Sequence, residues 1–221
     1  MRLHLAALLL TVAATPVMAQ DSTHAHAADH DHDNAVHGSG TLPSGWMART
    51  DNNAPLTNLK FEDMAPGWHV TTGPAVLLYR GTDHVDGRVH AIAKIHLFPG
   101  AGHAEGFGLF LGGQHLTDAG ESYTYFLIRG DGKYLVKRRN GTNVTTIADW
   151  TDSDAIVKQK ADGPVVNELS FQVGADSVGF MVNGKTVYTA PASQVDTKGT
   201  VGLRVNHNLN IHIESLGVHP L

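Results

Sequence analysis

The stretch "NELSFQVGADSVGFMVNGKTVYTA", residues 167–190, decides the fold of this chain. Apolar and polar residues alternate through its segments, and a period of two is typical of β-strands. Asn183 and Gly184 separate "FMV" from "KTVY". Both residues tolerate the positive φ of a type I′ turn, so the pair predicts a tight antiparallel hairpin. Such hairpins exclude a parallel α/β architecture for this half of the chain.

Similar short segments, broken by glycine and polar turns, run through the chain from residue 41 onward. The longest is "GRVHAIAKIHLF", residues 87–98, in which apolar residues alternate with His90, Lys94 and His96. This pattern predicts a long strand with one buried face.

A second hairpin is expected within residues 121–141, where Gly130-Asp131-Gly132 separates two strands. The tripeptide Arg129-Gly130-Asp131 is interpreted as the tip of this hairpin rather than as an adhesion motif. Helical structure is expected only as a turn around residues 152–159. Roughly ten to twelve strands at this spacing predict an all-β, two-sheet antiparallel jelly-roll sandwich, with a closed barrel as the alternative.

The N-terminal residues have the pattern of a secretory signal peptide. Arg2 precedes an apolar run from Leu5 to Ala14, and small residues lead to Ala19. The run is shorter than the roughly 20 residues of a membrane span, so we expect cleavage after residue 19 and no remaining membrane anchor. The chain has no cysteine, which suits a bacterial periplasmic or secreted protein better than a small eukaryotic ectodomain.

Residues 20–45 are predicted to be a disordered tail and linker, rich in His and Asp, ahead of a domain at residues 46–221. Two His-x-His pairs make this tail a candidate metal site. Neutral imidazoles so spaced can chelate Zn²⁺, Cu²⁺ or Ni²⁺, and a solvated spacer is the alternative. The candidate ligands are His24, His26, His30 and His32.

Charge excludes a nucleic-acid partner. The formal net charge is −5, and the Lys and Arg residues are scattered. The densest basic run, "KRR" at 137–139, is interpreted as the solvated end of a strand. The acidic runs at 83–86 and 149–154 offer oxygen ligands for Ca²⁺ in a loop, but neither has the spacing of a known calcium loop, so solvated loops are favoured.

The tryptophans and histidines of the domain are weaker indications of a ligand or metal site. Trp68 and Trp150 are interpreted as core or sheet-edge aromatics, with sugar stacking as the alternative. His90 and His96 are about 20 Å apart along one strand. His207 and His212 differ by an odd number of residues, so they point to opposite faces of a regular strand. A histidine metal site within one strand is therefore not expected, although one between strands stays open.

Residues 66–218 resemble the concanavalin A-like lectin/glucanase (laminin-G-like jelly-roll) superfamily, particularly bacterial secreted 3-keto-disaccharide hydrolase-like and family 16 glycosidase-like domains. The resemblance rests on an ordered set of segments: "GFGLFLGG", "YTYFLIRGDGKYLVKRRNG", "NELSFQV", "VGFMVNGKTVY" and "GTVGLRV". It implies a curved sandwich whose concave sheet and rim loops bind carbohydrate, in some members with Ca²⁺. Retaining glucanases of the superfamily carry two Glu and one Asp at alternate positions of one strand. None of the five Glu of this chain, at 62, 105, 121, 168 and 214, has that spacing.

Polar strand faces supply the candidate ligand-binding residues. Alternation puts Tyr123, Tyr125 and Arg129 on one side of a strand, and it puts Arg204 and His212 on the polar sides of two later strands. Aromatic rings can stack on sugars and planar donors can bind hydroxyls, while an ordinary solvated face is the alternative.

We therefore expect a secreted or periplasmic module that binds a glycan or small sugar through its concave sheet. A glycoside or keto-sugar hydrolase-like enzyme, with catalytic residues unknown, is the alternative. A periplasmic metal-binding protein that uses the His-rich tail is the second alternative.

Overall fold

The computed structural model describes residues 32–100 and 102–221. The predicted signal peptide and three of the four candidate tail ligands, His24, His26 and His30, lie outside these residues, and His32 is exposed. Asp33–Leu221 forms one compact unit. Within the described residues no helix has the length and apolar character needed to cross a membrane.

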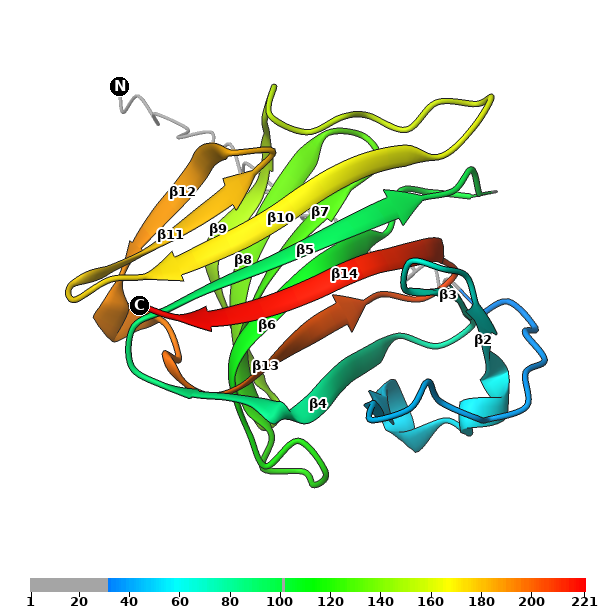
Figure 1. Ribbon diagram of the computed structural model, residues 1–221, viewed down its shortest axis with the longest axis horizontal. Coiled ribbons are helices and arrows are strands. Elements are labelled where there is room, and N and C mark those ends of the chain that lie inside the picture. The colour runs from blue at the N-terminus through cyan, green and yellow to red at the C-terminus, as the bar shows by residue number, and fades with distance from the viewer. Residues whose placement is uncertain (1–31, 101) are drawn as a thin grey trace, which may run out of the picture. The chain divides into compact units, whose positions relative to one another are not determined.

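Two seven-stranded sheets, built only from antiparallel pairs, make up the unit (Figure 1). We call them sheet A and sheet B. Sheet A has the order β1-β4-β13-β6-β7-β8-β9. Its strands are β1 (Met47–Thr50), β4 (Val76–Asp86), β13 (Lys198–Val205), β6 (Gly106–Gln114), β7 (Ser122–Arg129), β8 (Lys133–Asn140) and β9 (Asn143–Asp152).

Sheet B lies nearer the viewer in Figure 1 and has the order β12-β11-β10-β5-β14-β3-β2. Its strands are β12 (Lys185–Pro191), β11 (Ser177–Val182), β10 (Val165–Val173), β5 (Val89–Leu97), β14 (Asn210–Pro220), β3 (Trp68–Thr72) and β2 (Leu59–Asp63). The predicted all-β antiparallel sandwich is confirmed.

The core between the sheets follows from the period-two pattern. In β5 every second residue is buried, from Val89 to Leu97. Phe126 of sheet A meets Phe180 of sheet B with ring centroids 5.2 Å apart, and both side chains are fully buried. Burial of each such side chain stabilises the folded state by about 1.5 to 3 kcal/mol.

Both predicted hairpins are present. Asn183 and Gly184 join β11 to β12 with φ of 50° and 76°, the positive values that a type I′ turn requires. Residues 130–132 join β7 to β8, so the Arg-Gly-Asp tripeptide lies at a hairpin turn.

The segment expected to form a helical turn, residues 152–159, has a single hydrogen-bonded turn, in which Ile156 N–H donates to Ser153 O (3.3 Å), and no helix. The Asn167 side chain fixes the backbone beyond it: Val157 N–H donates to Asn167 Oδ1 (2.8 Å) and Asn167 Nδ2 donates to Val157 O (3.0 Å). Short 3₁₀ turns occur at other places, namely Asp51–Asn53, Leu56–Asn58 and Ala192–Gln194.

Part of the predicted linker lies against the domain. Asn34 N–H donates to Asn208 Oδ1 (2.6 Å), and Gly38 N–H donates to Thr57 O (2.8 Å). Leu42 packs against the core. Composition did not reveal these contacts, because they use backbone groups and a distant loop.

Candidate functional site

Each sheet has an outer face turned away from the core, and the candidate ligand-binding residues divide between the two faces. Tyr123, Tyr125 and Arg129 alternate along β7 with Thr124, Phe126 and Ile128, so they share the outer face of sheet A. Arg204 of β13 lies on this same face. His212 lies on β14 of sheet B. The structure therefore brings four of the five residues together and leaves His212 on the other side of the sandwich.

The outer face of sheet A curls toward its own side chains. β9 and β6 are separated by β7 and β8, which places them about 14 Å apart in a flat sheet. Nevertheless, Trp150 of β9 comes within 3.0 Å of the point where a Cβ on Gly106 would lie. This contact indicates a sheet that curves toward this side, and a larger residue at position 106 would collide with the indole ring. We call this surface the concave face.

Trp150 and Arg129 stack on the concave face. The guanidinium carbon of Arg129 lies 4.5 Å from the Trp150 ring centroid, while Arg129 Nε donates to Asp131 Oδ1 (2.8 Å). Trp150 remains half-buried, so part of its ring is available to a ligand. Trp150 lies in β9, the edge strand of sheet A, and Trp68 packs in the core, so both agree with the interpretation as sheet-edge or core aromatics.

A partly buried ion pair lies close to Tyr123 and Tyr125 on the concave face. Arg204 donates from Nη1 and Nη2 to the two carboxylate oxygens of Asp51, at 2.7 and 2.6 Å. Burial works against both charges, but the hydrogen bonds and mutual attraction outweigh it, so the pKa of Asp51 is lowered and that of Arg204 is raised. Burial also raises the phenol pKa of Tyr123 and Tyr125. The pair is therefore ionised, and both phenols neutral, at physiological pH.

A second ionic group adjoins Asp51. Arg49 Nε lies 2.9 Å from Glu121 Oε2, and Arg139 Nη1 lies 3.7 Å from Glu121 Oε1. These three residues line a pocket of about 300 Å³ together with Asp51. The Arg139 Nε atom is buried and has no hydrogen-bond partner among the described residues. The basic run lies at the end of β8 and is partly exposed, as predicted, but Arg138 also pairs with Asp196 and Arg139 with Glu121.

Three pockets are linked to one another through shared lining residues. The pocket of Arg49 and Glu121 shares Asp51 with a second pocket of about 270 Å³, which Arg204 and His207 also line. That pocket shares Glu105 with a third, of about 280 Å³, lined by His103. We call the three together the polar groove.

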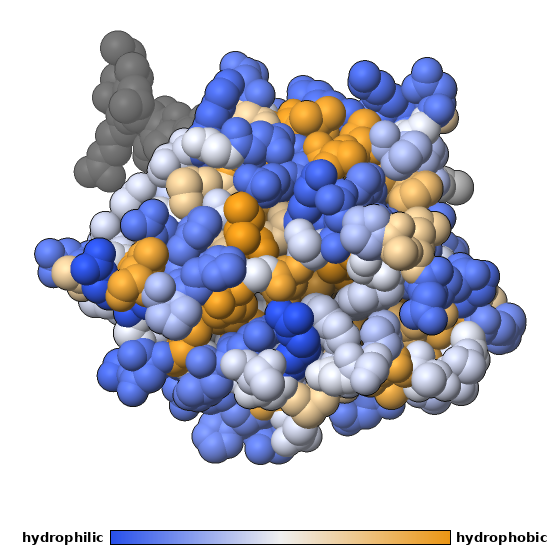
Figure 2. Space-filling view, in the orientation of Figure 1, coloured by the Kyte–Doolittle hydropathy of each residue, from blue (hydrophilic) through white to orange (hydrophobic). Residues whose placement is uncertain are grey.

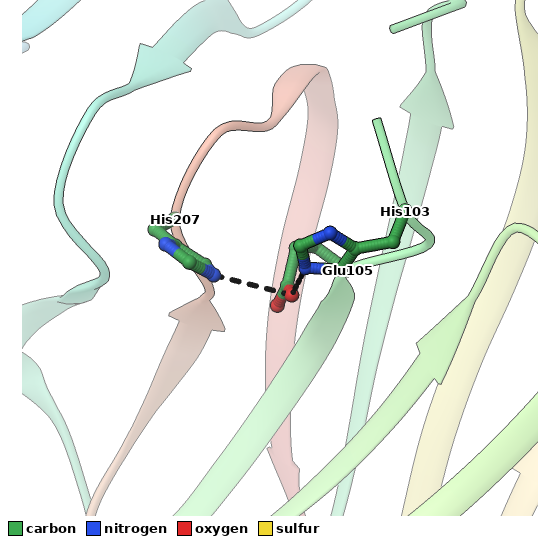
Figure 3. Close-up of side chains that lie close together, drawn as sticks. All are labelled: His103, Glu105 and His207. Atoms are coloured by element: carbon green, nitrogen blue, oxygen red, sulfur yellow. Dashed lines mark hydrogen bonds and ion pairs between the residues drawn. The ribbon is translucent and has the colours of Figure 1, made fainter. Parts of the chain in front are cut away.

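Glu105 brings two histidines together where the second and third pockets meet (Figure 3). His103 Nε2 lies 2.8 Å and His207 Nε2 3.2 Å from Glu105 Oε1. Within the described part of the chain, this is the one group of three or more His, Cys, Asp or Glu side chains close enough to share a metal ion. The aspartate runs considered for Ca²⁺ form no such group there.

Sheet B carries a row of histidines on its outer face. His69, His212 and His96 occupy paired positions on β3, β14 and β5, and the His212 ring centroid is 6.3 Å from that of His69 and 5.2 Å from that of His96. Burial, together with the charges of His96 and His69, lowers the pKa of His212. Figure 2, which views this side, shows hydrophilic and hydrophobic residues interspersed.

No local pattern in the sequence marks Asp51, Glu121 or the group around Glu105 as site residues. Each lies in a loop or at a strand end, and most of the partners are remote in the chain; Arg204 and Asp51, for example, are 153 positions apart. The sequence leaves a histidine site between strands open, and the ends of β13 and β6 bring His207 and His103 to Glu105.

No protein-family model matches the sequence, and no curated protein matches it. Solved structures do resemble the fold. The carbohydrate-binding module CBM66 from Bacillus subtilis has a TM-score of 0.58 and 11% identity, over 79% of this chain and 95% of the module.

A Bacillus subtilis protein of unknown function with a galectin-like fold has a TM-score of 0.59 and 12% identity, over 86% and 94% of the two chains. A Bacteroides ovatus GH16 protein in complex with the product G4G4G3G has a TM-score of 0.56 and 9% identity, over 80% and 96%. At such identities the likeness concerns the fold alone. The chain therefore has the concanavalin A-like jelly-roll fold of lectins and glucanases.

Proposed function

We propose that this chain is a secreted or periplasmic carbohydrate-binding module that holds its ligand on the concave face of sheet A. The observation that carries the proposal is the arrangement of Trp150 and Tyr125, two half-buried aromatic rings, beside the arginines of the same concave surface. Aromatic faces stack on the apolar faces of sugar rings, and guanidinium groups donate to hydroxyls.

The solved structures support this proposal at the level of the ligand class. One structural neighbour is a carbohydrate-binding module and another is bound to a glucan product. The predicted signal peptide supports export. Of the four candidates on the concave face, Tyr125 and Arg129 are accessible enough to contact a ligand directly, whereas Tyr123 and Arg204 are buried and would shape the surface from below.

The lowered pKa of the Asp51 carboxyl favours a binding role over hydrolysis. Glycoside hydrolysis requires one carboxylic acid with a raised pKa to protonate the leaving group. Asp51 and Glu121 share a pocket, but Arg204 lowers the pKa of Asp51, and Glu121 is held by two arginines. The surroundings of Asp51 therefore do not favour a protonated acid.

Tryptophan fluorescence tests the proposal with a built-in control. The chain has three tryptophans, and Trp46 and Trp68 pack against each other with ring centroids 4.9 Å apart. Sugars selected on a glycan array should change the emission of the parent chain and of Trp46→Phe. Trp150→Ala should lose this change and bind about tenfold more weakly or worse by calorimetry.

Circular dichroism and the melting temperature will show that Trp150→Ala remains folded. An array without any binder would refute the proposal. Full affinity in folded Trp150→Ala and Tyr125→Ala would place the ligand elsewhere and remove the observation on which the concave-face proposal rests.

A further inference from the structure

The group of His103, Glu105 and His207 is built at the end of a strand pair. Val205 of β13 pairs with Phe107 of β6, and Asn206 N–H donates to Gly106 O (2.9 Å), which extends the pairing by one step. Positions 207 and 105 therefore follow directly from the register of the two strands. His103 precedes Glu105 by two residues, and its ring reaches the same carboxylate oxygen (Figure 3).

Two of these side chains contact further partners through the atoms that point away from the group. His207 Nδ1 lies 3.3 Å from Asp33 Oδ1, and Asn206 Nδ2 donates to Glu105 Oε2 (3.0 Å). A carboxylate on the far nitrogen of an imidazole fixes the ring and raises the basicity of the near nitrogen, which is the usual outer arrangement of a metal-bound histidine. His207 Nε2 and Glu105 Oε1 are thereby left facing each other.

The near atoms lie close enough together to share one metal ion. Three atoms able to act as acceptors converge, two imidazole Nε2 and one carboxylate oxygen, and all lie within 4.8 Å of one another. Two imidazoles and one carboxylate form a donor set that Zn²⁺ accepts, with ligand atoms about 2.0 to 2.2 Å from the metal. The partly buried Glu105 and His207 side chains, 15% and 21% exposed, limit competition from water.

We propose that His103, Glu105 and His207 bind one divalent transition-metal ion of the Zn²⁺ class. Three protein ligands leave a fourth coordination position, as in zinc sites that bind water or a substrate. Glu105 lines two adjoining pockets, with His103 in one and His207 in the other, so this position faces the polar groove. The proposal does not depend on carbohydrate binding, and it concerns residues distinct from the histidines of the tail.

Calorimetric titration with Zn²⁺ tests the site in the full chain. Because the tail histidines can bind metal themselves, the reference variant carries Gln at positions 24, 26, 30 and 32. It should bind one equivalent of Zn²⁺ and melt at a higher temperature when Zn²⁺ is present. In that background, Glu105→Gln with His207→Gln should weaken binding at least about 100-fold. Exchange of His90 and His219, on the outer face of sheet B, for Gln is the matched control and should leave binding unchanged.

A milder variant separates metal binding from folding. His103 lies in an exposed loop, so His103→Gln should leave the metal-free melting temperature unchanged while it weakens Zn²⁺ binding. Asp33→Asn, which removes only the outer partner of His207, should cost about 10- to 100-fold in affinity. The proposal is overturned if the reference variant binds no Zn²⁺, or if the folded Glu105 and His103 variants bind it as well as the reference does.

Discussion

The two outer faces of the sandwich are both polar, but they are built differently. The concave face of sheet A contains a small second core, in which Leu116, from the loop after β6, packs with the buried Phe110 and Tyr79. Its charges are arginines paired with carboxylates. The outer face of sheet B has a row of histidines and a partly exposed Lys94–Glu214 pair (2.9 Å). One face thus carries arginine–carboxylate pairs and is partly filled, and the other carries histidines.

This difference shows why the same alternating pattern can lead to different surfaces. In a strand with one face toward the core, the residues of the other face meet whatever the rest of the chain brings over them. Over sheet A the chain brings Leu116 and Asp51, which seal aromatic and arginine side chains. Over sheet B only part of the face is covered, around His69 and His212.

The largest difference in stability between the two faces should come from substitution of Phe110. Its side chain is fully buried on the outer face of sheet A, so Phe110→Ala should lower the free energy of unfolding by about 3 to 5 kcal/mol. Ile92→Ala, on the half-buried outer face of sheet B, should cost about 1 kcal/mol. Urea denaturation measures both values. Equal costs would mean that the second core does not exist.

The ion pair on the concave face should give the next largest effect. Asp51→Asn leaves the buried Arg204 without its counter-charge, and we expect a loss of about 2 kcal/mol, less than for a fully buried pair because the Asp51 side chain is 40% exposed. The double variant Asp51→Asn with Arg204→Met should lose less than the sum of the single variants. Simple additivity in urea denaturation would contradict a coupled pair.

The smallest effect should be a pH dependence that comes from His212 of sheet B. The pKa of His212 is lowered in the folded chain, so between that value and the ordinary value of about 6.5 the unfolded chain binds more protons. The stabilisation by neutral His212 is therefore complete above about pH 6.5 and is lost as the pH falls toward the lowered pKa.

Melting temperatures measured between pH 8 and about pH 5, above the ordinary pKa range of Asp and Glu, will show this dependence. His212→Gln should flatten the decline, whereas the exposed control His84→Gln should not. A decline of equal size in His212→Gln would assign the pH dependence to other groups.

The sequence by itself determined the strands, their buried faces and the two hairpins. These features depend on interactions within a few residues: alternation sets which side chains share a face, and Asn183-Gly184 meets the φ requirement of its turn. The same logic placed Tyr123, Tyr125 and Arg129 together. It could not show that His212 belongs to the other sheet, because alternation shows which residues of one strand share a face but not which sheet that strand joins.

Only the tertiary structure decided the concave side, the Arg204–Asp51 pair and the group around Glu105. Each depends on strand pairing or loop packing between segments far apart in the chain, such as Asp33 beside His207 and Asp51 beside Arg204. Many loop closures are compatible with the same local pattern, and burial of the common core selects among them. The polar groups on which function depends are brought together by that selection, so no local signal marks them in the sequence.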